Sequence, residues 1–223
     1  MGAMNVVFDL GAVLFAWEPT RLVQAHLAPH APTEAAAAAM GRALFHHDDW
    51  TSFDCGTRTL ADSIARMSAR LALPPEPLFA MLDGLGERLE PIGVTVEMLE
   101  QLISHRDAGQ PVRLYYLSNM PAPYARAIER RHAFMGRFDG GVFSGDVKFL
   151  KPEREIYEVL AMRYSLDPAQ TVFIDDSAAN VEAARAFGWQ AIHCTAPAML
   201  PSQLQRYLPV SITLPVSNPR LRA

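Results

Sequence analysis

Short apolar runs that end at polar residues constrain the fold more than any other feature of this sequence. The clearest runs, each with the polar residue that follows it, are 5–8 with Asp9, 113–117 with Ser118, and 171–174 with Asp175. Continuous apolar runs of about five residues, without alternation, are typical of strands buried on both faces. Residues 141–143 and 190–194 are weaker strand candidates. Helical stretches separate these runs, so we predict an α/β fold with βαβ units and a parallel sheet.

The stretch from about residue 18 to residue 90 contains no convincing strand and has the patterns of helices. Thr33 precedes an alanine-rich segment, and Thr59 is followed three residues later by Asp62, as in a helix-capping box. Apolar residues then recur at helical spacing, first at Leu60, Ile64, Met67 and Leu71, and, after Pro75, at Leu78, Leu82, Leu85 and Leu89. We therefore predict an α/β core of residues 1–16 and 91–223, interrupted by a helical unit of residues 17–90.

Further helices are expected in the second part of the core. Pro121 and Pro152 suit the first turn of a helix, and a helix over 178–187 would be stopped by Gly188. The segment 209–223 is predicted to be irregular.

Composition narrows the class of protein. Half of the 223 residues are apolar, and 20 basic against 24 acidic residues give a net charge of −4. This excludes a disordered chain and argues against a dedicated nucleic-acid binder, which would need a basic face. Two cysteines, Cys55 and Cys194, cannot form a disulfide framework. No signal peptide and no apolar run of roughly 18 residues is visible, so we expect a cytoplasmic protein with no membrane partner.

Polar residues follow the predicted strands where an open parallel sheet binds its ligands. These residues are Asp9, Ser118 with Asn119, and Asp175 with Asp176, and Lys151 comes before a predicted helix. Each has an ordinary explanation when it is taken singly. An aspartate after a strand commonly caps a turn or a helix, and a lone lysine is commonly a solvated surface charge.

Taken together, these residues predict a site. Neighbouring carboxylates repel one another unless a cation lies among them, and ligand sets made of oxygen favour Mg²⁺. Lys151 would add a compact positive charge, and Ser118 and the Asn119 backbone N–H would donate to a phosphoryl oxygen. Such an assembly suits attack by a carboxylate on phosphorus.

At this point the sequence resembles the haloacid dehalogenase superfamily, which consists mostly of Mg²⁺-dependent phosphatases. The matching segments are 6–14, 114–119, Lys151–Pro152 with Ile156–Tyr157, and 173–177 with Asn180. The resemblance implies a Rossmann-like parallel sheet flanked by helices, with an inserted helical cap. The strings Trp17-Glu18-Pro19 and Asp54-Cys55-Gly56 resemble a subgroup that contains bacterial α-D-glucose-1-phosphate phosphatases.

The resemblance also implies a role for each matching residue. Asp9 would be the nucleophile and a metal ligand, and Gly11 would offer only its backbone carbonyl to Mg²⁺. The other implied roles are binding of the phosphoryl group by Ser118 and Asn119, charge neutralisation by Lys151, metal binding by Asp175 and Asp176, and support of the site by Asn180.

One position departs from the pattern of the family. Family phosphatases usually carry a second aspartate two residues after the nucleophile, where it protonates the leaving oxygen and later activates water. Here that residue is Gly11. The resemblance therefore implies a metal site without the expected general acid, a variant that occurs in the subgroup named above.

Three functions remain open from the sequence. The leading one is hydrolysis of a small phosphomonoester, such as a sugar phosphate, and the others are 2-haloacid dehalogenation and non-catalytic binding of a phosphorylated ligand. A dehalogenase would use Asp9 against carbon and would have no use for Asp175 and Asp176. The segment His46–Trp50 and Asp54 are the candidates for facing a substrate, although a polar helix end explains His46–Asp49 equally simply. The sequence assigns no oligomeric state.

Overall fold

The sheet has five parallel strands in the order β3-β2-β1-β4-β5. The structure is a computed structural model that describes residues 2–214, so most of the predicted irregular segment 209–223 lies outside the described residues. The strands are β1 (Met4–Phe8), β2 (Val112–Ser118), β3 (Gly140–Phe143), β4 (Thr171–Asp175) and β5 (Gln190–His193). All five predicted runs are therefore confirmed as strands, including the two weaker ones. The central strand is β1, which is flanked by β2 and β4.

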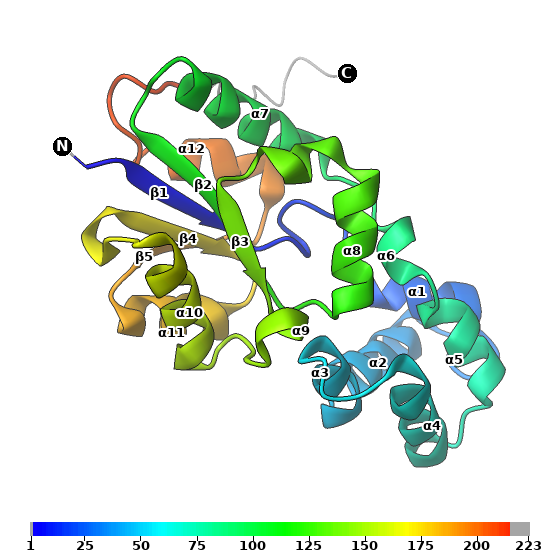
Figure 1. Cartoon of the computed structure of the whole chain (residues 1–223). Coiled ribbons are helices and arrows are strands. Elements are labelled where there is room, and N and C mark those ends of the chain that lie inside the picture. Colours follow the sequence, from blue (N-terminus) through cyan, green and yellow to red (C-terminus); the bar gives the residue numbers. More distant parts are fainter. Residues whose placement is uncertain (1, 215–223) are drawn as a thin grey trace, which may run out of the picture.

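Helices cover both faces of the sheet, which explains the continuous apolar runs (Figure 1). On one face lie α7 (Gly93–Asp107), α8 (Ala122–Arg131) and α12 (Leu200–Leu204), and on the other lie α10 (Arg154–Tyr164) and α11 (Ala178–Phe187). Along β1, Val6 and Phe8 pack into the first layer and Val7 into the second, and all three are fully buried. The short helix α9 (Ser144–Val147) follows β3, and the 3₁₀ helices are η1 (Ala133–Arg137), η2 (Pro168–Gln170) and η3 (Pro197–Met199).

Between β1 and α7 the chain forms helices, as the sequence predicts. They are α1 (Pro19–His26), α2 (Glu34–Phe45), α3 (Asp48–Asp54), α4 (Leu60–Leu71), α5 (Pro75–Leu82) and α6 (Leu85–Arg88). Thr33 and Thr59 cap α2 and α4 as expected, and the Thr59 hydroxyl also donates to the Asp62 carboxylate at 2.7 Å. In Figure 1 helices α1–α5 lie together beside the sheet. Their apolar side chains join the same core as the α7 face of the sheet, so the two parts are packed continuously.

Two predicted helices begin or end elsewhere. The leucine spacing from Leu78 to Leu89 predicts one helix, but α5 ends at Leu82 and α6 begins at Leu85. Gly84 between them has φ of +63°, a left-handed conformation that breaks the helix. The break lets α6 approach α8 so closely that a Cβ on Gly86 would lie 2.6 Å from Tyr124 Cα. The helix expected at Pro152 begins at Arg154 instead.

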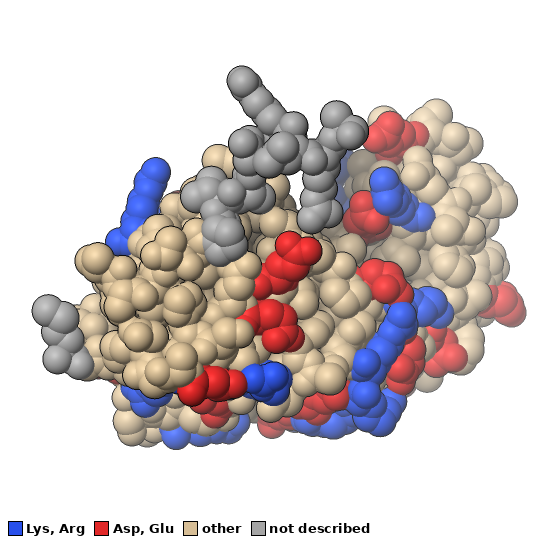
Figure 2. Space-filling model, turned by 90° about the horizontal axis from the view of Figure 1, so that it is seen from above, with Lys and Arg blue, Asp and Glu red and all other residues tan. Residues whose placement is uncertain are grey.

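Charged side chains of both signs are interspersed on the face that Figure 2 shows. Ion pairs join the segment 17–90 to the rest of the protein, with Arg130 on Glu87 and Arg131 on Glu90, each at 2.6 Å. Within residues 2–214, no helix is both long and apolar enough to cross a bilayer.

Candidate active site

Three carboxylates meet at the carboxyl edge of the sheet. Asp9 follows β1, Asp175 is the last residue of β4, and Asp176 follows it. One oxygen of each lies within 4.8 Å of the others, which confirms that the strand ends bring them together. Because β1 and β4 are neighbours in the sheet, parallel pairing alone places these residues at one edge.

Lys151 reaches this carboxylate group from the segment before α10. Its ammonium nitrogen lies 2.8 Å from Asp9 Oδ1 and 2.7 Å from Asp175 Oδ2, and only 1 % of its side chain is exposed. Burial alone would lower the pKa of Lys151, but the charges of Asp175 and Asp9 outweigh it and raise the pKa above its usual range. The lysine is therefore a buried cation rather than a solvated surface charge.

Two side-chain amides fix the position of these charges. Asn119 accepts a hydrogen bond from the Lys151 backbone N–H at 2.8 Å and donates one to the Lys151 carbonyl at 2.9 Å. Asn180 donates to both oxygens of Asp175, at 3.0 and 3.1 Å, and the Ser177 N–H donates to Asp175 Oδ1 at 2.8 Å. The Asn119 side chain thus holds the lysine segment, a role that the sequence reasoning did not foresee.

Three carboxyl groups, those of Asp9, Asp175 and Asp176, share the single positive charge of Lys151. Burial raises the pKa of Asp9 to about 7, against the opposing effect of Lys151, and repulsion from Asp175 and Asp176 adds to the rise. Burial and Asp175 likewise raise the pKa of Asp176. Such a site favours a further positive charge, and its all-oxygen donors fit Mg²⁺, which takes a few carboxylates and keeps several waters.

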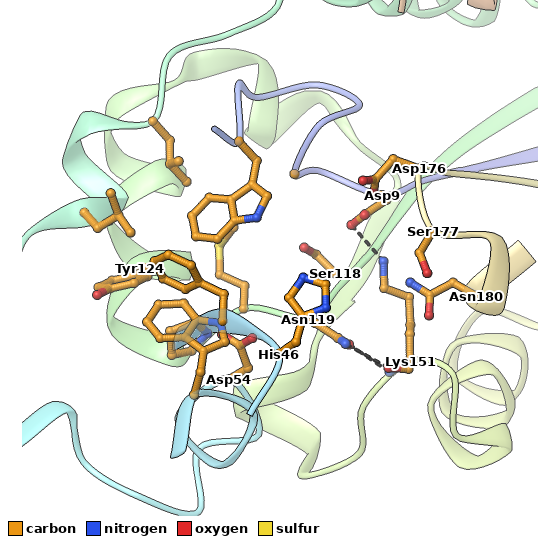
Figure 3. A pocket seen from close by; sticks show the side chains of 18 residues that line it. Asp9, His46, Asp54, Ser118, Asn119, Tyr124, Lys151, Asp176, Ser177 and Asn180 are labelled. Carbon is orange, nitrogen blue, oxygen red and sulfur yellow. Dashed lines mark hydrogen bonds and ion pairs between the residues drawn. The ribbon is translucent and has the colours of Figure 1, made fainter. Parts of the chain in front are cut away.

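A cavity of about 270 Å³ opens beside this group (Figure 3). Asp9, Gly11, Ser118, Asn119, Lys151, Asp176, Ser177 and Asn180 line its polar part. The structure therefore brings the residues singled out from the sequence to one cavity, except Asp175, which is fully buried and contacts Lys151.

The rest of the cavity wall is apolar and largely aromatic. It consists of Trp17, Phe45, Trp50, Leu85, Leu89, Met120, Pro121 and Tyr124, with His46 and Asp54 as its polar members. Trp17 stacks on Trp50 with ring centroids 6.2 Å apart, and Phe45 meets both rings edge-on. The sequence reasoning missed most of this wall, because its residues come from segments that lie far apart in the sequence.

The segment expected to face a substrate is divided between two roles. His46, Trp50 and Asp54 line the cavity, whereas His47 caps the N-terminus of α3. Asp49 points away, into ion pairs with Arg66 and Arg70, each at 2.8 Å. His46 thus lines the cavity, whereas His47 and Asp49 make the contacts of a polar helix end.

Gly11 leaves open the position where family phosphatases carry their second aspartate. Its φ lies outside the left-handed region, and the nearest atom to an added Cβ is Trp17 Cβ at 3.9 Å. Space and backbone geometry therefore permit a side chain at this position.

Comparison with known proteins identifies a family. The model of the haloacid dehalogenase-like hydrolases matches residues 5–188. A sesquiterpene phosphatase, AstK of Aspergillus oryzae, is 28 % identical over 189 residues, which cover 85 % of this chain and 88 % of that protein. The drimenol cyclase DrtB of Aspergillus calidoustus is 24 % identical over 84 % of this chain and 33 % of its own length.

Solved structures share the fold. An enzyme of the haloacid dehalogenase family from Bacteroides thetaiotaomicron, bt-2542, in complex with magnesium and inorganic phosphate, superimposes with a TM-score of 0.63 at 21 % identity, covering 86 % of this chain and 93 % of that one. The L-2-haloacid dehalogenase of Xanthobacter autotrophicus gives 0.63 at 16 % identity, over 94 % and 86 %. Together with the parallel sheet and the residues at its carboxyl edge, the match over residues 5–188 shows that this chain belongs to the haloacid dehalogenase-like hydrolases.

Proposed function

We propose that this hydrolase is a Mg²⁺-dependent phosphatase that cleaves a small phosphomonoester through an aspartyl-phosphate intermediate. The observation that carries the proposal is the buried group of Asp9, Asp175 and Asp176 with Lys151 among them. A carboxylate nucleophile needs positive charge beside it when a phosphate dianion approaches, and Lys151 supplies part of it.

Each residue would take a separate part in the reaction. Asp9 attacks phosphorus in line, and Lys151 and Ser118 stabilise the equatorial oxygens. Bound by Asp9, the Gly11 carbonyl, Asp176 and Asp175, Mg²⁺ would neutralise further negative charge on the phosphoryl group. Asn119 and Asn180 keep Lys151 and Asp175 in place through the hydrogen bonds described above.

We further propose that residues 17–90 act as a cap that selects the organic part of the substrate. Most of the side chains that this segment contributes to the cavity are apolar, namely Trp17, Phe45, Trp50, Leu85 and Leu89, against the polar His46 and Asp54. A phosphate ester of a hydrocarbon alcohol therefore suits the cavity better than a sugar phosphate. The sesquiterpene phosphatase activity in the name of the relative AstK is in line with such a substrate.

The test is an assay with p-nitrophenyl phosphate and with 2-chloropropionate, each with and without Mg²⁺. The proposal expects hydrolysis of the phosphate ester that EDTA abolishes, and no release of chloride. Asp9→Asn should keep the fold and lose turnover, because an amide neither attacks phosphorus nor binds Mg²⁺ well. Chloride release without metal would instead make the protein a dehalogenase. Inactivity on a broad panel of phosphate esters would leave a binding protein.

A further inference from the structure

The proposed reaction needs a proton donor that position 11 does not supply. When the P–O bond breaks, an alcohol with a high pKa leaves well only if its oxygen receives a proton at that moment. Gly11 carries no side chain, and Asp9 and Lys151 are engaged with each other. Another titratable group that lines the cavity must therefore provide this proton.

Asp176 belongs to the proposed metal site, so three other titratable side chains of the cavity wall remain among the described residues. Tyr124 is engaged elsewhere, because its hydroxyl donates to the Leu82 carbonyl at 2.5 Å and its pKa is raised by burial. His46 is exposed, at the end of α2. Asp54, the last residue of α3, is only 8 % exposed. Figure 3 shows His46 and Asp54 on the cap side of the pocket and Asp9, Asp176 and Lys151 on the other.

The backbone of Asp54 is tied to the loop that carries the phosphoryl-binding residues. Its carbonyl accepts a hydrogen bond from the Ser144 hydroxyl at 2.6 Å, and the same hydroxyl oxygen accepts one from the Met120 N–H at 2.8 Å. Met120 follows Ser118 and Asn119 directly. One buried serine therefore fixes the end of α3 relative to the end of β2, and with it the place of the Asp54 carboxyl over the cavity.

The surroundings of the carboxyl favour its neutral form. Burial raises the pKa of Asp54 well above its usual range, although a hydrogen bond from the Trp50 side chain and the charge of Lys151 act in the opposite direction. The protonated form that burial favours is the form that can donate a proton during the reaction. Asp54 and Lys151 also line the same cavity.

We propose that Asp54, from the helical insertion, is the general acid and base of this enzyme and replaces the aspartate that is missing at position 11. The inference rests on the proposed phosphatase function. In the first step an Asp9 oxygen bonds to phosphorus, the bond to the alcohol oxygen breaks, and that oxygen takes the Asp54 proton. In the second step the Asp54 carboxylate takes a proton from water, whose oxygen bonds to phosphorus and releases Asp9 and inorganic phosphate.

The test compares Asp54→Asn with the wild type on hexyl phosphate and on p-nitrophenyl phosphate. General acid catalysis contributes about 10²–10⁴-fold, and an aryl oxide leaves readily without a proton. Asp54→Asn should therefore reduce turnover of hexyl phosphate by roughly 10²-fold or more. With p-nitrophenyl phosphate it should retain a rapid burst of about one p-nitrophenolate per site, followed by slow turnover, because the phosphoenzyme then lacks its base.

Two further variants make the result specific. Asp48→Asn changes an exposed acid of the same helix that does not line the cavity, and it should leave both activities unchanged. Adding Gly11→Asp to Asp54→Asn should restore much of the hexyl phosphate turnover, because it returns an acid to the other side of the same cavity. An equal loss on both substrates in the first phase, or the alkyl-specific loss in His46→Gln instead, would overturn the assignment.

The outcomes separate this inference from the function on which it rests. If Asp9→Asn remains active, the phosphatase mechanism itself fails. If Asp9→Asn is inactive while Asp54→Asn keeps the wild-type ratio of alkyl to aryl turnover, the mechanism stands and Asp54 is not its acid. Thermal unfolding of Asp54→Asn shows whether the fold is intact, and the change is conservative because an amide has nearly the shape of the neutral acid.

Discussion

The ammonium nitrogen of Lys151 lies 2.8 Å from Oδ1 of Asp9, and both side chains are at least nine-tenths buried. The contact gives the proposed nucleophile a fixed orientation and partly offsets the cost of burying its charge. It also places a cation where an incoming phosphate would need one. Stability and catalysis therefore depend on the same ion pair.

Replacing Lys151 should lower both the stability of the fold and the rate of catalysis. Lys151→Met leaves Asp9, Asp175 and Asp176 without a counter-charge, so we expect a loss of about 3–5 kcal/mol in the free energy of unfolding without metal. Phosphatase turnover should fall by at least about 10²–10³-fold. Urea denaturation with and without Mg²⁺ checks the electrostatic cause, because Mg²⁺ should stabilise this variant more than the wild type. Equal stabilisation of the two proteins would contradict it.

A second buried charge, Asp49, serves the structure of the helical insertion rather than the reaction. Its carboxylate accepts hydrogen bonds from Arg66 and Arg70, each at 2.8 Å. Burial by itself raises the pKa of Asp49, but the hydrogen bonds from the two arginines outweigh burial and hold the pKa below its usual range. A carboxyl whose pKa is lowered by folding stabilises the protein above its unfolded pKa, and this contribution is lost as the pH falls through the folded pKa.

Asp49→Asn should therefore destabilise the fold in a pH-dependent way. We expect a loss of about 1–2 kcal/mol at about pH 7, a range that allows for the solvent screening of the half-exposed Arg66. The difference from the wild type should shrink as the pH falls below about 4. Urea midpoints measured across this range check the prediction, with Asp48→Asn as a control. A difference that stays constant with pH would show that packing, not charge, is lost.

The sequence predicted the sheet and the carboxylate group because both follow from local rules. Residues 5–8 and 171–174 form buried parallel strands, and the carboxyl ends of neighbouring parallel strands meet at one edge. Asp9 and Asp175 therefore had to lie close together once the strand order was known. The sequence did not predict the break at Gly84, because the spacing of the leucines stays regular even when one residue between two helices adopts a left-handed conformation.

The cavity wall could not be predicted, because it depends on contacts between distant segments. Trp17 lies at the start of the insertion and Tyr124 lies in α8 of the core, and nothing in their spacing shows that they share a cavity. The hydrogen bonds of Asn119 to the Lys151 backbone likewise join residues 32 positions apart. Only the tertiary structure distinguishes such a positioning contact from direct binding of substrate.

The aromatic wall should determine which alcohols are accepted. Trp17→Ala removes an apolar surface that a hydrocarbon chain would contact, at a cost of about 1–2 kcal/mol, or roughly 5–30-fold in kcat/KM for octyl phosphate. Methyl phosphate is too small to reach the wall, so its kcat/KM should not change. Phe79→Ala, which alters a half-exposed aromatic side chain of α5 outside the cavity, is the matched control. Parallel losses on both esters would mean that Trp17 supports the site rather than the substrate.

The last prediction concerns Gly11, which lies two residues after the proposed nucleophile Asp9. Gly11 needs no glycine-specific backbone conformation, and an added Cβ meets only ordinary contact with Trp17. Gly11→Asp should therefore fold, and it should place a carboxyl where family phosphatases have one. In the otherwise wild-type chain this second acid should raise the turnover of alkyl phosphates, whose leaving oxygen needs a proton, more than that of aryl phosphates.

The measurement is kcat for hexyl phosphate and p-nitrophenyl phosphate in the wild type and in Gly11→Asp, at the same Mg²⁺ concentration. A gain of up to about 10-fold, confined to the alkyl ester, is expected, because Asp54 already acts as the general acid and a second acid adds only a small part of the about 10²–10⁴-fold that such catalysis is worth. A change of equal size on both esters would mean that the new carboxylate acts on the metal or on Asp9 instead. A wild type that is already equally fast on both esters would show that the glycine is no deficit, since a donor within the cavity then supplies the proton in full.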